Sequence, residues 1–205
     1  MKNLVIITLF LVLTTNITAQ TNSFVDQRDK RVYKTVLIGN QNWMAENLAF
    51  KADSGCMAYN NEDSNVVKYG YLYNFNTSKN ICPVGWHLPS DSDWKQLETT
   101  LGMTQTDVKK EGWRGEGIGS KLKSSTGWTY NVADDNLSGF NALPGGFRNY
   151  DNTFDYIEDY CYFWTSTAYD KEYAWNRAVI RDFGGVNRAL YLRTRLFSVR
   201  CLKDK

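Results

Sequence analysis

The chain has a single histidine, His87, and no two of its cysteines lie close together in the sequence. One imidazole cannot build a zinc site from several histidines, and it allows no serine–histidine–aspartate triad away from its own surroundings. The four cysteines include no CxxC pair, which argues against a redox or zinc motif. His87 stands between Trp86 and Leu88 without an evident nucleophile or acid beside it, and we expect it to make a structural hydrogen bond.

Neither positive nor negative charge dominates, because the chain has 24 Lys and Arg residues and 22 Asp and Glu residues. This balance gives no electrostatic footprint for nucleic acid. Long apolar runs are also lacking apart from Leu4–Leu13, which follows Lys2 and precedes the small residue Ala19. That run is shorter than the roughly 20 residues that span a bilayer. It predicts a signal peptide over residues 1–19, no membrane span in the mature chain, and export to the periplasm, cell surface or medium.

An exported chain folds where thiols oxidise, so its four cysteines predict two disulfides among three possible connectivities. Proline is scarce, with three residues, whereas 15 glycines accompany a 15% share of aromatic residues. Because long helical periodicity is also scarce, this composition favours an irregular α+β or β-rich extracellular domain. We expect a flexible leader over residues 20–30 and one domain over residues 31–205.

One helix can be predicted in detail. Ser90 is a good N-cap, and Asp93 stands where a capping box needs an acidic side chain. Trp94, Leu97 and Leu101 then share one helical face. Alternating or apolar runs predict strands at Arg31–Ile38, Phe140–Phe147, Cys161–Thr167, Ala174–Ile180, Val186–Tyr191 and Phe197–Leu202.

Eight blocks of the chain resemble, in order, the Fibrobacter succinogenes major paralogous domain. They include NQNWMAENL (Asn40–Leu48), CPVGWHLPSDSDWKQLE (Cys82–Glu98), GFNALPGGFRNY (Gly139–Tyr150) and FSVRCLKD (Phe197–Asp204). The others are YGYLYNF (Tyr69–Phe75), GSKLKSSTGW (Gly119–Trp128), YFWTSTAY (Tyr162–Tyr169) and AWNRAV (Ala174–Val179). The resemblance runs from about Arg31 to Asp204, and it implies membership of a family of exported bacterial proteins whose biochemical role is not established.

The GWHLPSDSDW stretch and the closing FSVRC are also similar to formylglycine-generating enzymes, which have a C-type-lectin-like fold. This second resemblance implies an α+β domain of small antiparallel sheets. It would have about two helices and a long loop region, and its termini would meet in one sheet. It further implies that Cys82 pairs with Cys201, which leaves Cys56 and Cys161 as the second disulfide.

The same resemblance raises two kinds of site. Formylglycine-generating enzymes need two cysteines close together, whereas Cys161 and Cys201 are far apart and both have disulfide partners in this scheme. Lectin-like domains bind Ca²⁺ through a Trp-Asn-Asp strand, and here Arg177 follows Trp175 and Asn176. An arginine in the carboxylate position would repel Ca²⁺, so we expect no metal site and no cofactor.

Aromatic residues gather between Tyr150 and Trp175, and flat rings can stack on sugars or anchor a protein partner. We therefore place the candidate ligand-binding site on the loop-rich side of the domain. Its residues are Tyr150, Asp151, Asn152, Tyr156, Trp175, Asn176 and Arg177. The many arginines of the C-terminal half are expected to lie on solvated strand faces and to pair with nearby carboxylates.

These observations favour an exported, non-catalytic domain that binds a glycan or a cell-surface protein. A catalytic relative of the formylglycine-generating enzymes with a different chemistry is one alternative. A structural subunit of a surface assembly is another.

Overall fold

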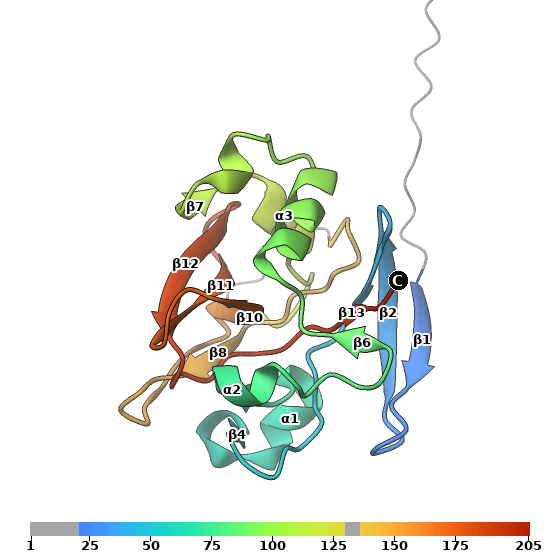
Figure 1. Cartoon of the computed structure of the whole chain (residues 1–205), viewed down its shortest axis with the longest axis vertical. Coiled ribbons are helices and arrows are strands. Elements are labelled where there is room, and N and C mark those ends of the chain that lie inside the picture. Colours follow the sequence, from blue (N-terminus) through green and yellow to red (C-terminus); the bar gives the residue numbers. More distant parts are fainter. Residues whose placement is uncertain (1–20, 130–135) are drawn as a thin grey trace, which may run out of the picture.

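The structure is a computed structural model that describes residues 21–129 and 136–205, so the expected signal peptide lies outside the described residues. A five-stranded sheet forms one side of the molecule in the order β1-β2-β3-β13-β6 (Figure 1). Its strands are β1 (Thr21–Val25), β2 (Val32–Ile38), β3 (Gln41–Met44), β6 (Trp86–His87) and β13 (Leu202–Lys203). The first and last strands of the described chain therefore belong to the same sheet.

A six-stranded sheet forms the other side in the order β7-β12-β11-β10-β8-β9. Its strands are β7 (Gly112–Arg114), β8 (Gly145–Arg148), β9 (Phe154–Ile157), β10 (Tyr160–Ala168), β11 (Tyr173–Ile180) and β12 (Val186–Leu192). The central strands are antiparallel, with Tyr160 opposite Ile180 and Trp175 opposite Leu190. The short strands β4 (Cys56–Met57) and β5 (Leu72–Tyr73) pair separately.

The described helices are short. They are α1 (Asp63–Tyr69), α2 (Phe75–Ser78), α3 (Asp91–Thr100) and α4 (Ile118–Leu122), with 3₁₀ turns η1 (Tyr59–Asn61) and η2 (Asp107–Lys109). Only α3 is longer than two turns. Among the residues described, no helix is long and apolar enough to cross a membrane. The expected α+β class is confirmed, with more helices than the two that the resemblance implies.

Helix α3 begins as the sequence predicts. The Ser90 side chain accepts a hydrogen bond from the Asp93 backbone, and the Asp93 side chain accepts one from the Ser90 backbone. Trp94 and Leu97 are buried, and Leu101 packs against the same cluster. The reciprocal cap satisfies two backbone N–H groups that a helix start otherwise leaves open.

The core lies on both faces of the six-stranded sheet, because successive side chains of a strand point to opposite faces. On β10, Tyr162 and Trp164 contribute to one hydrophobic cluster, whereas Cys161 and Phe163 contribute to the other. Helix α3 covers the Cys161 side through Trp94, whose ring stacks on Phe163 at 5.6 Å between ring centroids. Both faces of the central strands are thereby filled.

The structure contains the disulfide Cys82–Cys201, with 5.9 Å between the Cα atoms, and this confirms the first predicted pairing. The second pairing is wrong, because Cys56 and Cys161 are both free. Cys161 is fully buried on the α3 side of the sheet, whereas Cys56 packs against the cluster on the opposite side. The six-stranded sheet therefore stands between the two thiols.

Two other expectations also differ from the structure. The expected flexible leader contains β1, whose residues Thr21–Val25 pair with Val36–Val32 of β2. The apolar run Phe197–Leu202 is mostly irregular, and only its end forms β13. In the irregular part of this run, isolated β-bridges pair Phe197 with Tyr73 and Ser198 with Phe163. This run crosses between the sheets, and therefore it cannot pair continuously with either.

Candidate functional site

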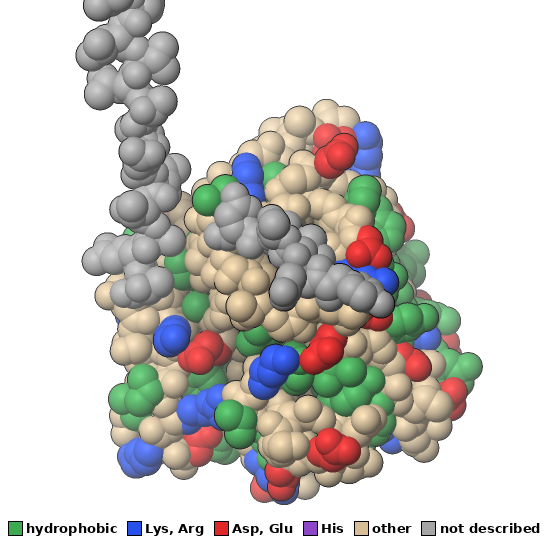
Figure 2. All heavy atoms as spheres, turned by 180° about the vertical axis from the view of Figure 1, so that it is seen from behind, with side chains coloured by type: hydrophobic (Ala, Val, Ile, Leu, Met, Phe, Trp, Pro, Cys, Tyr) green, Lys and Arg blue, Asp and Glu red, His purple; other side chains and the backbone are tan. Residues whose placement is uncertain are grey.

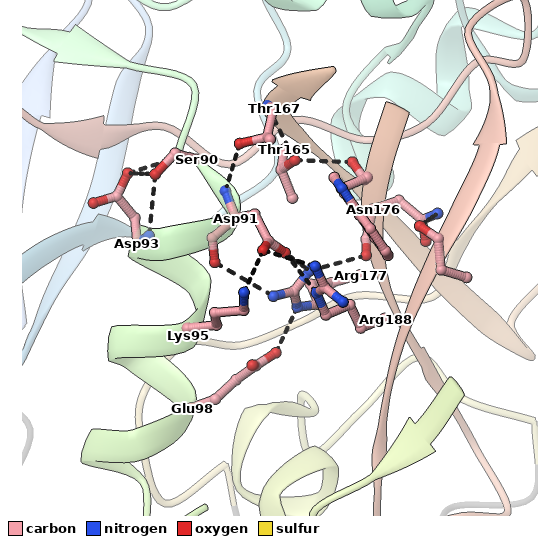
Figure 3. A network of polar contacts seen from close by, with 12 residues as sticks. Ser90, Asp91, Asp93, Lys95, Glu98, Thr165, Thr167, Asn176, Arg177 and Arg188 are labelled. Atoms are coloured by element: carbon pink, nitrogen blue, oxygen red, sulfur yellow. Dashed lines mark hydrogen bonds and ion pairs between the residues drawn. The ribbon is translucent and has the colours of Figure 1, made fainter. Parts of the chain in front are cut away.

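Three of the residues predicted for the ligand site, Trp175, Asn176 and Arg177, lie on β11. Figure 3 shows Asn176 and Arg177 at a network of buried charges. Arg177 has no exposed surface. Its Nε donates to Glu98 Oε1 at 2.6 Å, and its Nη1 donates to Asp91 Oδ1 at 2.9 Å. Asn176 is also fully buried and donates to the carbonyl oxygen of Ala189. These two side chains face the interior and present nothing to a ligand.

The network joins α3 to the sheet. Arg188 binds Asp91 through Nε and Nη2, Lys95 binds the same carboxylate, and Arg114 binds Glu98 at 2.7 Å. Burial by itself raises the pKa of Asp91, but the hydrogen bonds from Arg188 and the charge of Arg177 outweigh it and hold that pKa far below its usual range. Asp91 stays charged because it binds Lys95, Arg177 and Arg188.

Trp175 lies beside this network and is 8% exposed. The guanidinium of Arg188 stands 3.5 Å from its ring centroid, and Tyr169 meets the ring edge-on at 6.1 Å. Trp175 is thus enclosed between an arginine and a tyrosine. The seven predicted residues consequently do not form one exposed surface.

The expectation that the C-terminal arginines solvate strand faces is wrong for several of them. Arg181 follows it, since it binds Asp159 and Asp182 near the surface. Arg177, Arg188 and Arg200 are buried instead. Arg200 donates to Asn47 Oδ1 at 2.8 Å and to the carbonyl of Met44 at 3.1 Å, and burial lowers its pKa to about 9.

The other four predicted residues lie on the hairpin of β8 and β9, where they are exposed. Tyr150 and Tyr156 keep 60% and 53% of their surface accessible. Tyr156 has a backbone φ of 62°, in the left-handed region that a bulky residue rarely adopts. Backbone strain of this kind tends to gather at functional sites. The hairpin therefore holds an aromatic side chain at the surface in an unfavourable backbone conformation.

Aromatic rings continue from this hairpin into the core. Tyr156 contacts Tyr160 at 4.9 Å between ring centroids, and Tyr160 stacks on Tyr162 at 5.6 Å. Tyr162 then stacks on Phe197 at 5.0 Å. Burial raises the pKa of Tyr162 above its ordinary value. The exposed rings are thus anchored to a rigid interior array.

A groove runs beside the hairpin and consists of two adjoining cavities of about 510 and 310 Å³. Both are lined by Asn74 and Thr194. The larger is further lined by Asn76, Lys171, Glu172, Leu192 and Arg193, and the smaller by Gly55, Cys56, Met57, Arg148 and Leu196. Arg148 also contacts Asn152 through its Nη2, which connects the groove to the predicted hairpin residues. Such volumes are typical of small-molecule sites.

Sequence reasoning missed this groove. Its lining comes from β4, α2, β8, the β10–β11 turn and the residues after β12, so no single motif contains it. Asn74 is the N-cap of α2, because its side chain accepts a hydrogen bond from the Thr77 backbone. The only sequence signal was proximity, since Arg148 precedes Tyr150 and Lys171 precedes Trp175 in the predicted region.

Two further cavities share no lining residue with the groove. One of about 900 Å³ is lined by residues of β1, β2, β3, β6 and β13, and we place no site there because the structure does not describe the chain before β1. The other, about 210 Å³, is lined by Trp113, Tyr160, Ile180 and Phe183 on the six-stranded sheet. Figure 2 shows hydrophobic side chains gathered on the flank that carries this sheet.

His87 behaves as expected, since its Nδ1 lies 2.6 Å from Asp204 Oδ1 in a hydrogen bond that holds the C-terminal segment. Within residues 21–129 and 136–205, no group of three His, Cys, Asp or Glu side chains has an arrangement that could hold a metal ion. The polar groups that line the groove are amide, hydroxyl and charged side chains.

Comparison with known proteins gives one match. The family model of the Fibrobacter succinogenes major domain matches residues 36–203. Searches of curated proteins and of solved structures found no match. The matched residues include the six-stranded sheet, the disulfide, the groove and the five-stranded sheet apart from β1 and the start of β2. The chain therefore belongs to the Fibrobacter succinogenes major domain family.

Proposed function

We propose that this protein is an exported, non-catalytic binding domain and that it recognises a glycan in the groove beside the β8–β9 hairpin. The observation that carries the proposal is the meeting of two features at one end of the molecule. A groove lined by amide, hydroxyl and charged side chains adjoins a hairpin that exposes Tyr150 and Tyr156. Sugar rings have both an apolar face and a rim of hydroxyl groups, and this site offers a partner for each.

The free cysteines support a non-catalytic role. Chemistry of the formylglycine-generating type uses two neighbouring cysteines, whereas Cys56 and Cys161 lie on opposite sides of the six-stranded sheet. Burial raises the pKa of Cys161 to about 12, so its thiol is protonated and enclosed. Burial also raises the pKa of Cys56, although its side chain accepts a hydrogen bond from the Ala52 backbone. Neither thiol has the lowered pKa of an activated nucleophile.

We further propose that the architecture is C-type-lectin-like. Support comes from the first and last described strands sharing a sheet and from the bridge between Cys82, ahead of α3, and Cys201 before β13. A second, separate sheet with irregular connections also fits this fold.

A glycan array probed with the mature protein tests the proposed function, followed by titration with the oligosaccharide that binds. Tyr150→Ala and Tyr156→Ala should each weaken binding about 10-fold, in line with the loss of an aromatic contact at a binding site. His87→Asn is the control for an unrelated surface position. Silence across the array, or full affinity in both tyrosine variants, would contradict a glycan site at this hairpin.

A second candidate is an extracellular protein that docks on the 210 Å³ cavity of the six-stranded sheet. Trp113 and Phe183 favour it, because they remain 39% and 42% exposed and meet edge-on at 5.5 Å. Exposed aromatic pairs of this kind are typical of protein contacts. Trp113→Ala separates the two candidates, because it should abolish partner binding and leave glycan binding unchanged.

A further inference from the structure

The arginines in the described part of the chain differ in what balances their charge. Five bind a carboxylate within 3 Å, Arg31 stands 5.5 Å from the ring centroid of Tyr33, and Arg200 is held by backbone carbonyls and Asn47. Three further arginines, of which Arg148 and Arg193 line the groove, form another group. In the part of the chain that the structure describes, no carboxylate lies within ion-pair distance of Arg148, Arg193 or Arg195. The fold therefore leaves a group of positive charges without counter-charges at one place.

Two of these guanidinium groups are held by aromatic rings. Arg193 stands 4.5 Å from the ring centroid of Phe75 and donates from Nη1 to the carbonyl of Lys171 at 3.1 Å. Arg195 stands 4.7 Å from Tyr191 and 5.9 Å from Tyr150. The Nε of each is buried without a hydrogen-bond partner in the described structure. Stacking fixes a planar guanidinium without an ion pair. The charge of Arg195 acts on Asp151, whose pKa is lowered mainly by its hydrogen bonds from Thr153 and also by this charge.

These charges belong to the groove. Arg148 lines the smaller cavity, and Lys171 and Arg193 line the larger one. Arg195 follows Thr194 in the chain, but it is not a lining residue and its guanidinium packs on Tyr191 and Tyr150 instead. Glu172 is the one carboxylate among the lining residues, and Asp151 on the hairpin accepts hydrogen bonds from Thr153. Positive charge therefore exceeds negative charge along the groove.

We infer that the ligand of the groove is an acidic saccharide, one that carries carboxylate or sulfate groups; this inference rests on the proposed glycan-binding function. Guanidinium groups bind these planar or tetrahedral oxyanions through paired N–H donors. The amides of Asn74 and Asn76 and the hydroxyl of Thr194 can bind the neutral hydroxyl groups between the charges. Glu172 accepts from a hydroxyl group and repels an anionic group placed at its end of the groove.

The test is a calorimetric titration of the mature protein with three probes of similar length. They are an oligogalacturonate, which carries carboxylates alone, a heparin-derived oligosaccharide, which carries sulfates in addition to carboxylates, and a neutral cello-oligosaccharide. We expect binding of at least one acidic probe, and affinity that falls as sodium chloride is raised, because salt screens exposed charges. The neutral probe should bind at least about 10-fold more weakly, since it lacks charge-assisted hydrogen bonds.

Substitutions locate the binding. Arg193→Gln and Arg148→Gln should each weaken binding of the acidic probe about 10-fold. Lys171→Gln should also weaken it, and because Lys171 lies on an exposed turn this substitution removes a positive charge without disturbing the packing. Arg181→Gln is the matched control, because that arginine is also half-buried but binds Asp159 and Asp182.

The outcomes separate this inference from the proposed function. Tighter binding of the neutral probe, or acidic binding that none of the three groove substitutions weakens, would overturn the acidic specificity and leave glycan binding standing. Silence with all three probes, together with silence on a glycan array, would overturn both.

Discussion

Glu98 is fully buried and accepts hydrogen bonds from both Arg114 and Arg177. Replacing it with Gln keeps the shape of the side chain but leaves Arg114 without its counter-charge and Arg177 with Asp91 alone. Breaking a buried ion pair in this way costs about 3–5 kcal/mol of unfolding free energy. Urea denaturation of Glu98→Gln should show that loss, whereas Glu111→Gln at an exposed position should stay within about 0.5 kcal/mol of the original protein. Equal stabilities would mean that the network does not hold α3.

Asp91 makes the fold sensitive to acid. Its pKa in the folded protein lies below the value of about 3.9 expected for an unfolded chain, so its contribution to stability is present above that pH and is lost as the pH falls through the folded pKa. Urea denaturation between pH 7 and pH 3 should therefore show a stability that decreases below about pH 4. Asp91→Asn should be less stable at pH 7 and should show a flatter decrease. Parallel curves for the two proteins would contradict this role.

Residue type alone misplaced the arginines of this network. An arginine in a strand is usually a surface residue, and the sequence offers no local sign that Arg177 points inward. A signal was nevertheless present on the predicted helix, where Asp91 and Glu98 are seven positions apart and so share a face beside Trp94. Acidic residues that become buried beside an apolar helical face need cations opposite them. Considering the helix and the strands together would have paired these carboxylates with the arginines of the strands.

At the scale of the element, the start of α3 depends on its capping box. Removing the Ser90 hydroxyl deprives the Asp93 backbone N–H of its acceptor, and such losses cost about 0.5–2 kcal/mol. Ser90→Ala should lower the urea midpoint accordingly. Ser92 lies two residues further along the chain and is exposed, so Ser92→Ala is the control and should change the urea midpoint very little. A larger effect at Ser92 than at Ser90 would show that the cap is not the cause.

The strands that sequence patterns identified best are β10, β11 and β12. The apolar residues of β10 and β11 are mostly buried on both faces of the sheet, whereas those of β12 other than Val186 are half-buried. β1 was missed because its residues, TNSFV, are mostly polar, and pairing with β2 decides its conformation. The groove was missed for a related reason. Tertiary contacts bring its lining together from five segments, and periodicity reports only on neighbours within one element.

At the scale of the whole molecule, the cysteines give a direct check of the chain path. Alkylation of the denatured but unreduced protein should modify Cys56 and Cys161 and spare Cys82 and Cys201. In the native protein Cys56 should react faster, because Cys161 is fully buried with a pKa of about 12. Peptide mass spectrometry identifies the modified residues. Modified Cys82, or a peptide joining Cys56 to Cys161, would contradict the described connectivity.

The shared sheet of β1 and β13 has a consequence for how the domain can be combined with others. Both ends of the described chain emerge from the five-stranded sheet, whereas α2, β4 and β8, which border the groove, lie away from it (Figure 1). A domain whose ends lie close together can be inserted into a loop of another protein or circularly permuted. A host protein or surface joined to residue 21 or residue 205 would therefore hold the groove outward, as a display scaffold does.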